Sequence, residues 1–215
     1  MDFCAEAGGV DILLWLAHDG YDYPFEDDYQ VKWSYLIESL VEITGYRKDV
    51  QVTIEYKMKE PRTHQYISTV GKSLVICNEV GASNFGVALD YGHALYAGEN
   101  PAESAALLNR YDKLFHVHLN DNYRGWDDDL MVGSVSFWET LEFFYWLHRI
   151  DYDGWYTIDI WPSRSDGVKA LQESILRANR FMEIASNLPY EKFKRMQNEN
   201  AVMDIMHLLT QTIMG

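Results

Sequence analysis

The 215-residue chain lacks several features that would place it in a specialised class of protein. Its two cysteines, Cys4 and Cys77, are too few for a disulfide framework and are typical of a reducing cytosol. No uniformly apolar stretch exceeds about ten residues, so we expect no transmembrane helix. The first residues contain no basic stretch followed by an apolar run. We therefore expect no secretory signal and a cytoplasmic location.

Basic residues are also scarce, since 18 lysines and arginines stand against 33 aspartates and glutamates, giving a net charge of −15. Such a chain repels nucleic-acid backbones and anionic membrane surfaces, so neither is expected as a partner. Surplus carboxylates most often form a solvated surface, and in some proteins they gather around cations. Composition alone does not separate these two uses.

The order of apolar segments predicts the fold class. There is no internal repeat, low-complexity tract or linker, so residues 1–188 are read as one domain and residues 189–215 as a Met-rich helical tail. Periodicity predicts strands at 10–15, 50–56, 85–89, 114–119 and 156–160. Helices are predicted at 29–44, 67–80, 101–109, 137–149 and 168–184. Five βα units with strands apolar on both faces indicate a parallel sheet covered by helices, either doubly wound or part of a (β/α)8 barrel.

Polar residues stand at the carboxyl ends of four consecutive predicted strands. Glu55 follows the second strand, Asp90 the third, His118 lies in the fourth, and Asp159 lies in the fifth. Carboxyl ends of parallel strands meet at one edge of the sheet, where active sites of such folds lie. Carboxylate and imidazole groups are ligands for Mn²⁺, Mg²⁺, Co²⁺ or Zn²⁺. The combination therefore predicts a metal site.

Each of these residues taken singly has an ordinary structural explanation. A histidine in an apolar strand is more often a hydrogen-bonded core residue than a ligand, and we expect this of His116. The Asp127-Asp128-Asp129 run is, on its own, typical of a solvated loop or a helix cap. Four buried carboxylate or imidazole groups at adjacent strand ends are much harder to explain without a cation, because their desolvation and mutual repulsion add.

Several longer segments resemble the xylose isomerase-like TIM-barrel superfamily, and they occur in the same order as in that family. They are IEYKMKEPR at 54–62, DYGHALYAG at 90–98, LFHVHLN at 114–120, DDDL at 127–130, and the stretch from Tyr152 to Arg164. The resemblance extends from Asp11 to Met182. It implies that the five predicted strands correspond to the fourth through eighth strands of the family barrel, so that the fold is a partial (β/α)8 TIM barrel.

The ligand pattern narrows the resemblance to a branch of the superfamily. Xylose isomerases proper usually carry Glu at the position of Asp90 and Asp at the position of His118. The present set is more similar to the L-rhamnose isomerases, and also to ketose 3-epimerases, which share an arginine at the position of Arg124. The epimerases use one metal and lack the pair formed by Asp127 and Asp129, so the resemblance favours an aldose–ketose isomerase.

The resemblance also implies two divalent metal ions, with Mn²⁺ as first choice and Mg²⁺, Co²⁺ or Zn²⁺ as alternatives. The first ion would be held by Glu55, Asp90, His118 and Asp159. The second would be held by Asp90, His93, Asp127 and Asp129. Such enzymes move a hydride between C1 and C2 of an open-chain sugar with the help of their metals.

Further residues take roles by resemblance. The catalytic residues would be Lys57, His93 and Asp127, and the substrate-binding residues Trp15, Lys57, His93 and Arg124. Lys57 would polarise the sugar O1, although a plain salt bridge to a ligand carboxylate is compatible with the same position. Trp15 resembles an aromatic wall that excludes water, and a core tryptophan is an equally good explanation. Arg62 is expected to pair with an acid near the ligands.

Five strands do not close a barrel, which typically needs eight strands and about 250 residues. We therefore expect a monosaccharide-binding protein that forms a homo-oligomer or joins a complementing chain supplying the missing strands. Two other functions stay open: a single-metal ketose 3-epimerase, and an inactive metal-binding remnant. The superfamily also includes a zinc-dependent abasic-site endonuclease, but the net charge of −15 opposes DNA binding.

Overall fold

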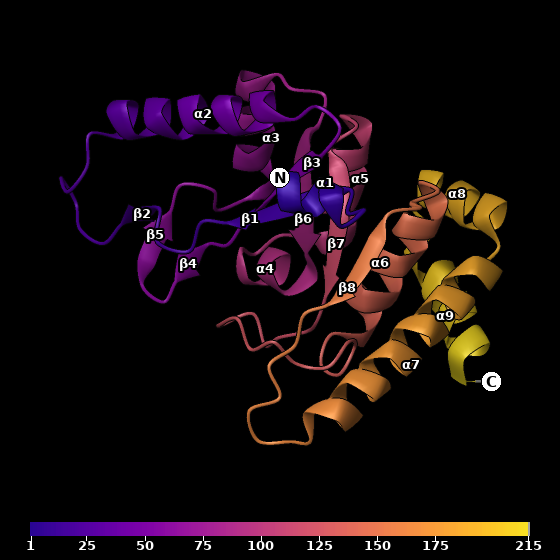
Figure 1. Ribbon diagram of the computed structural model, residues 1–215. Helices are drawn as coiled ribbons and strands as arrows, with labels where there is room; N and C mark the ends of the chain where they lie inside the picture. Colours follow the sequence, from indigo (N-terminus) through magenta and orange to yellow (C-terminus); the bar gives the residue numbers. More distant parts are fainter. Residues whose placement is uncertain (215) are drawn as a thin grey trace.

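A curled parallel sheet forms the centre of the computed structural model, which describes residues 1–214 (Figure 1). The sheet consists of β1 (Asp11–Trp15), β3 (Gln51–Glu55), β6 (Phe85–Asp90), β7 (Leu114–Leu119) and β8 (Trp155–Ile158). These strands are hydrogen-bonded in the order in which they occur in the chain, and every neighbouring pair is parallel. The sheet curls through 201° into a half-barrel. The predicted fold class is confirmed.

Helices cover the outer face of the half-barrel. They are α2 (Tyr29–Tyr46), α3 (Val70–Val80), α5 (Pro101–Arg110), α6 (Phe137–Arg149) and α7 (Gly167–Asn187). The first turns of four of them are fixed by side-chain caps that accept backbone N–H groups, as Asp28 does for α2, Thr69 for α3, Asn100 for α5 and Asp166 for α7. Because Thr69 is extended and caps α3, that helix begins at Val70 rather than at the predicted residue 67.

The hydrophobic core lies between the outer face of the sheet and these helices. Val52, Ile54, Val87 and Leu89 project outward from the central strands and are completely buried. The inner face of the half-barrel differs in composition, although Thr53 and Ala88 on it are also completely buried. Its side chains include polar groups that lead up to the carboxyl edge of the sheet.

Several short elements were not predicted from the sequence. A five-residue helix, α1 (Asp2–Glu6), precedes β1, and α4 (Tyr91–Tyr96) follows β6 without a loop. A small antiparallel sheet, β2 (Gly20–Tyr21), β5 (Thr63–Gln65) and β4 (Lys59–Glu60), lies beside the carboxyl end of β1. The turn of this sheet sets Arg62 against Asp22 at 2.7 Å. Arg62 therefore pairs with an acid as predicted, and this acid follows β2 and is not one of the candidate ligands.

The C-terminal residues form α8 (Tyr190–Asn198) and α9 (Val202–Met214), which lie beside α6 and α7 (Figure 1). Phe193 and Met196 of α8 are buried, and Phe193 packs against Tyr145 of α6. Part of this tail therefore covers the main core. No helix among the described residues has the length and apolar composition needed to cross a membrane.

Candidate metal centre

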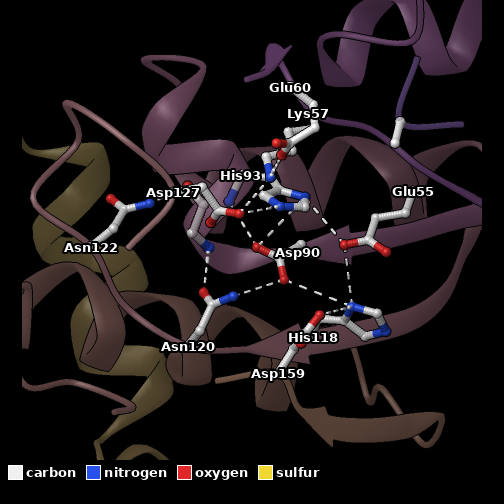
Figure 2. Close-up of polar contacts among 12 residues, drawn as sticks. Glu55, Lys57, Glu60, Asp90, His93, His118, Asn120, Asn122, Asp127 and Asp159 are labelled. Atoms are coloured by element: carbon white, nitrogen blue, oxygen red, sulfur yellow. Dashed lines mark hydrogen bonds and ion pairs between the residues drawn. The ribbon is translucent and has the colours of Figure 1, made fainter. Parts of the chain in front are cut away.

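Four polar side chains converge where the central strands end (Figure 2). Glu55 closes β3, Asp90 closes β6, His118 is the penultimate residue of β7, and Asp159 directly follows β8. Their nearest ligand atoms all lie within 4.8 Å of one another. Because parallel strands in this register bring their carboxyl ends to one edge, residues distant in sequence meet there.

His118 lies at the centre of this group of four. Its Nδ1 atom is 3.3 Å from Glu55 Oε1, 3.2 Å from Asp159 Oδ2 and 3.7 Å from Asp90 Oδ2. The same nitrogen is buried and makes no hydrogen bond of acceptable geometry. An imidazole nitrogen surrounded by carboxylate oxygens but left without a hydrogen bond is positioned as a metal ligand is.

The electrostatics of the group also fit a divalent cation. Burial raises the pKa of Asp90 to about 6, against the attraction of His93 and His118. Burial also disfavours the charged form of Glu55, but the attraction of the nearby His118 and His93 outweighs this and lowers the pKa of Glu55 to about 2. Three carboxylates and an imidazole form an oxygen and nitrogen donor set suited to Mn²⁺, Mg²⁺, Co²⁺ or Zn²⁺.

Two asparagines hold Asp90 in place. Asn120 Nδ2 donates to Asp90 Oδ2 at 2.9 Å, and its own Oδ1 accepts from the Gly92 N–H at 2.7 Å. Asn122 Nδ2 donates to the Gly92 carbonyl at 2.7 Å. A Cβ at position 92 would stand 2.5 Å from Asn120 Oδ1, so only glycine permits this contact. These supporting residues were not predicted, because their polarity at a strand end was the only signal in the sequence.

A second polar group adjoins the first. His93 of α4 places Nδ1 at 3.1 Å from Glu55 Oε1 and Nε2 at 3.2 Å from Asp127 Oδ2. Lys57 Nζ lies 2.7 Å from the same Asp127 oxygen and also pairs with Glu60. His93 and Lys57 lower the pKa of Asp127 to about 2, although burial acts in the opposite direction. The salt bridge that was considered for Lys57 is therefore present.

Trp15 covers this lysine, with Lys57 Nζ 5.2 Å from the centre of the indole ring. The indole is 44% exposed, so Trp15 is not a core residue, and its role as a wall of the site stays a prediction. Lys57, in contrast, is almost completely buried. The pair places a cation and an apolar surface side by side next to the ligand group.

The two remaining predicted residues, Asp129 and Arg124, lie in different surroundings. Asp129 lies close enough to other carboxylates that burial and the charges of Asp127, Asp90 and Asp159 raise its pKa to about 7. Arg124 directs its guanidinium to Glu139 in the first turn of α6. Within residues 1–214, the compact ligand group is the one formed by Glu55, Asp90, His118 and Asp159. The second predicted metal position stays a prediction.

His116 precedes His118 by two residues in β7, so both side chains point to the inner face of the sheet. Its Nδ1 is 3.0 Å from Asp11 Oδ2 of β1, and its Nε2 is 2.7 Å from Thr157 Oγ1 of β8. As expected, His116 is a hydrogen-bonded interior residue. The contact joins three strands across the concave face, and two strands separate β1 from β7 in the sheet.

The fold and the site together define a parallel βα half-barrel with a candidate divalent-metal centre at its carboxyl edge. A family model described as xylose isomerase-like TIM barrel matches residues 1–181. The chain belongs to this family.

Two curated relatives illustrate the sequence similarity. Xylose isomerase of Thermus thermophilus is 29% identical over 142 residues, which are 63% of this chain and 37% of that protein. An uncharacterized protein of Methanocaldococcus jannaschii is 36% identical over 125 residues, which are 56% of this chain and 39% of that protein. The matched region thus spans well under half the length of these relatives.

Solved structures agree on the fold. A D-tagatose 3-epimerase-like protein superposes with a TM-score of 0.67 at 24% identity, covering 86% of this chain and 66% of that one. An L-ribulose 3-epimerase gives a TM-score of 0.67 at 17% identity, covering 86% of this chain and 65% of that one. At such identities the agreement concerns the fold.

Proposed function

We propose that this protein provides the active site of a divalent-metal-dependent sugar isomerase that interconverts an aldose and a ketose. The observation that carries the proposal is the ligand group around His118 Nδ1 beside the buried ammonium of Lys57. A sugar isomerase needs a cation for neighbouring hydroxyl oxygens and a positive group for the oxygen that gains charge. The candidate ligand group and Lys57 lie at the same edge of the sheet, which supports the proposal.

The side chains of the site would divide the work. The bound metal would supply Lewis acidity to the sugar oxygens. Lys57, held charged by Asp127 and Glu60, would orient and polarise the carbonyl oxygen of the open-chain sugar. His93, fixed between Glu55 and Asp127, would hold a proton close to the substrate hydroxyls. Trp15 would form an apolar wall that keeps water from the carbon atoms exchanging hydrogen.

The proposed metal is Mn²⁺, with Mg²⁺, Co²⁺ and Zn²⁺ as alternatives of suitable ligand preference. A second ion is proposed at Asp90, His93, Asp127 and Asp129. Because Lys57 lies 2.7 Å from Asp127, the ammonium and a second cation would compete for the same carboxylate oxygen. The number of ions bound per chain is therefore informative about the reaction.

Within this function, the set containing Asp90 and His118 supports a rhamnose isomerase-type enzyme acting on a free monosaccharide. A ketose 3-epimerase is the second candidate. It is favoured by the single compact ligand group among the described residues and by the names of the solved structures that share the fold. An inactive remnant that binds metal without turnover is the third. The free cysteines, of which Cys77 is buried, support a cytoplasmic location.

The test combines metal analysis with assays. The purified chain would be loaded with Mn²⁺ and incubated with L-rhamnose, L-mannose, D-allose, D-xylose and D-tagatose. Aldose–ketose conversion with two ions per chain supports the isomerase. Conversion between ketoses with one ion per chain supports the epimerase. Bound metal without any conversion, in the chain alone and in its assembled form, supports the remnant.

A homo-oligomer or a complementing chain would supply the remaining strands of the barrel.

A further inference from the structure

We propose that Asp121 is a positioning residue for the loop formed by residues 122–129. That loop carries Asp127, which contacts both Lys57 and His93. Asp121 lies just after the end of β7 and is not one of the candidate metal ligands. Its effect on catalysis would pass through Asp127 and therefore rests on the proposed function. Its effect on the loop is a property of the fold and does not depend on the reaction.

Asp121 joins the two ends of this loop. Its carbonyl oxygen accepts the Leu130 N–H at 2.9 Å, in an antiparallel bridge between the two residues. Its carboxylate Oδ1 accepts the Asn122 N–H at 2.9 Å. The other oxygen, Oδ2, accepts the N–H groups of Val135 at 2.7 Å and Ser136 at 2.9 Å. One residue thus holds the base of the loop and the chain that leaves it.

The chemistry of these contacts requires a carboxylate at position 121. The side chain of Asp121 is completely buried, so water cannot replace the backbone groups that it binds. An asparagine has one accepting oxygen and would present an NH2 group on the other side, where a backbone N–H already points. A buried N–H group left without an acceptor is costly.

The same carboxylate fixes the start of α6. Four of the five outer helices are capped by their own N-cap side chain, whereas that of Ser136 at α6 makes no such bond. Asp121 instead binds the N–H of Ser136 from outside the helix. The loop meets the first turn of α6 a second time, because Arg124 pairs with Glu139 there. Asp121 therefore couples the loop to the beginning of the helix.

The backbone of the loop needs such restraint. Arg124 and Asp129 have φ angles of 66° and 48°, in the left-handed region that is unfavourable for residues other than glycine. Such residues persist where surrounding contacts determine the conformation. Asp128 Oδ2 accepts the Tyr123 N–H at 2.9 Å within the loop, and the Trp161 N–H donates to the Asp129 carbonyl at 2.9 Å. Asp121 adds the contacts at the base.

Asp127 reaches the candidate centre from this loop. Its Oδ2 lies 2.7 Å from Lys57 Nζ and 3.2 Å from His93 Nε2. Lys57 precedes the small sheet and His93 belongs to α4, so both contacts depend on where the separate loop is held. Without them, Lys57 would keep only its pair with Glu60 among the described carboxylates.

The first measurement is hydrogen exchange of the full, metal-free chain. Asp121→Asn should speed exchange of the Val135 and Ser136 amides at least about tenfold, as loss of a hydrogen bond to a carboxylate does. Asp166→Asn is the matched control, because Asp166 also accepts two backbone N–H groups, but at the exposed start of α7. The control should leave exchange of the Val135 and Ser136 amides unchanged.

The second measurement follows the contact with Lys57. Acetic anhydride would modify the metal-free chain, and mass spectrometry would compare Lys57 with Lys169, whose side chain is 82% exposed. Asp121→Asn should raise the relative rate at Lys57 toward that of Asp127→Asn, in which the partner is removed directly. Adding Asp121→Asn to Asp127→Asn should then change the rate less than about twofold, because both substitutions act through one contact.

A milder variant covers the case in which Asp121→Asn does not fold, as judged by circular dichroism. Asp128→Ala removes a hydrogen bond within the same loop at its surface. It should raise the modification rate of Lys57 in the same direction and by a smaller factor than Asp127→Asn does.

Three results would overturn the proposal. The first is unchanged exchange of the Val135 and Ser136 amides in Asp121→Asn. The second is an unchanged modification rate of Lys57 in the folded variants of Asp121 and Asp128. The third is a full additional effect of Asp121→Asn in the Asp127→Asn background, which would mean that Asp121 acts on the fold as a whole. None of these results requires bound metal or turnover, so they are distinguishable from a failure of the proposed reaction.

Discussion

The central and outer strands of the half-barrel place their ligands in different surroundings. Glu55, Asp90 and His118 lie on the central strands, and their side chains are at most 9% exposed. Asp159 follows the outer strand β8, and its side chain is 50% exposed. The candidate metal centre thus combines three buried side chains with one that is half exposed to water. The difference in exposure arises from the sheet: β3, β6 and β7 each have a neighbouring strand on both sides, whereas among the described residues β8 is paired only with β7.

The largest effect is expected from the most buried ligand. Asp90→Asn removes a charge that would contact both proposed metals, so metal binding should be lost at both positions. Isothermal titration with Mn²⁺ would measure this, with exposed Glu103 on α5, changed to Gln, as the control. Retention of two ions at full occupancy by the Asp90 variant would refute a bridging role for this carboxylate.

A smaller effect is expected at the outer strand. Asp159→Asn should weaken Mn²⁺ binding less than Glu55→Gln does, because a half-exposed carboxylate interacts through a higher effective dielectric. Titration of both variants under identical conditions provides the comparison. If Asp159→Asn lost as much Mn²⁺ affinity as Glu55→Gln, the difference in burial between the two carboxylates would have no effect on metal binding.

The metal-free centre should also respond to pH. Burial works against a charged His118, but Asp159 and Glu55 raise its pKa from 6.5 to about 10. Because this pKa is higher in the folded state, its stabilising contribution is complete below pH 6.5 and is lost as the pH rises toward 10. The melting temperature of the metal-free protein should therefore fall over this interval.

Changing His118 to Gln should flatten that dependence. Mn²⁺ should also reduce it, since metal binding requires a deprotonated imidazole. Differential scanning calorimetry across the interval would measure both effects. A melting temperature that is equally pH-dependent in the variant would mean that another group is responsible.

The smallest effect is expected below the metal centre. Thr157→Val removes the hydroxyl that contacts His116 Nε2 and should lower the free energy of unfolding by about 1 kcal/mol, the usual value for one hydrogen bond. Urea denaturation would measure the change, with Thr210→Val on α9 as the control. An unchanged midpoint for Thr157→Val would show that the contact between the outer strand and β7 adds nothing to stability.

Short-range patterns in the sequence were sufficient to predict the parallel βα units and the convergence of the candidate ligands, whereas the choice of a partial barrel over a doubly wound sheet came from the family resemblance. Alternation of apolar segments indicated the βα units, and the shared direction of parallel strands brought Glu55, Asp90 and His118 to one edge. Contacts that depend on side-chain reach were harder to predict. The pairing of Arg124 with Glu139, and the support of Asp90 by Asn120 through Gly92, require knowledge of how loops pack.

The short elements were missed for a different physical reason. α4 has six residues and starts immediately after β6, so it offers no sequence window long enough for helical periodicity. The strands of the small sheet have two or three residues each, and their pairing depends on long-range contacts with Gly20 and Tyr21. Elements of this length are determined by the surrounding structure.

Each carboxylate oxygen of Asp90 accepts one hydrogen bond. Its Oδ1 accepts the His93 N–H at 2.7 Å, and its Oδ2 accepts from Asn120 at 2.9 Å. A carboxylate oxygen has two lone-pair sites, so each oxygen keeps one for a further partner. The first of the two bonds also caps the helix that carries His93.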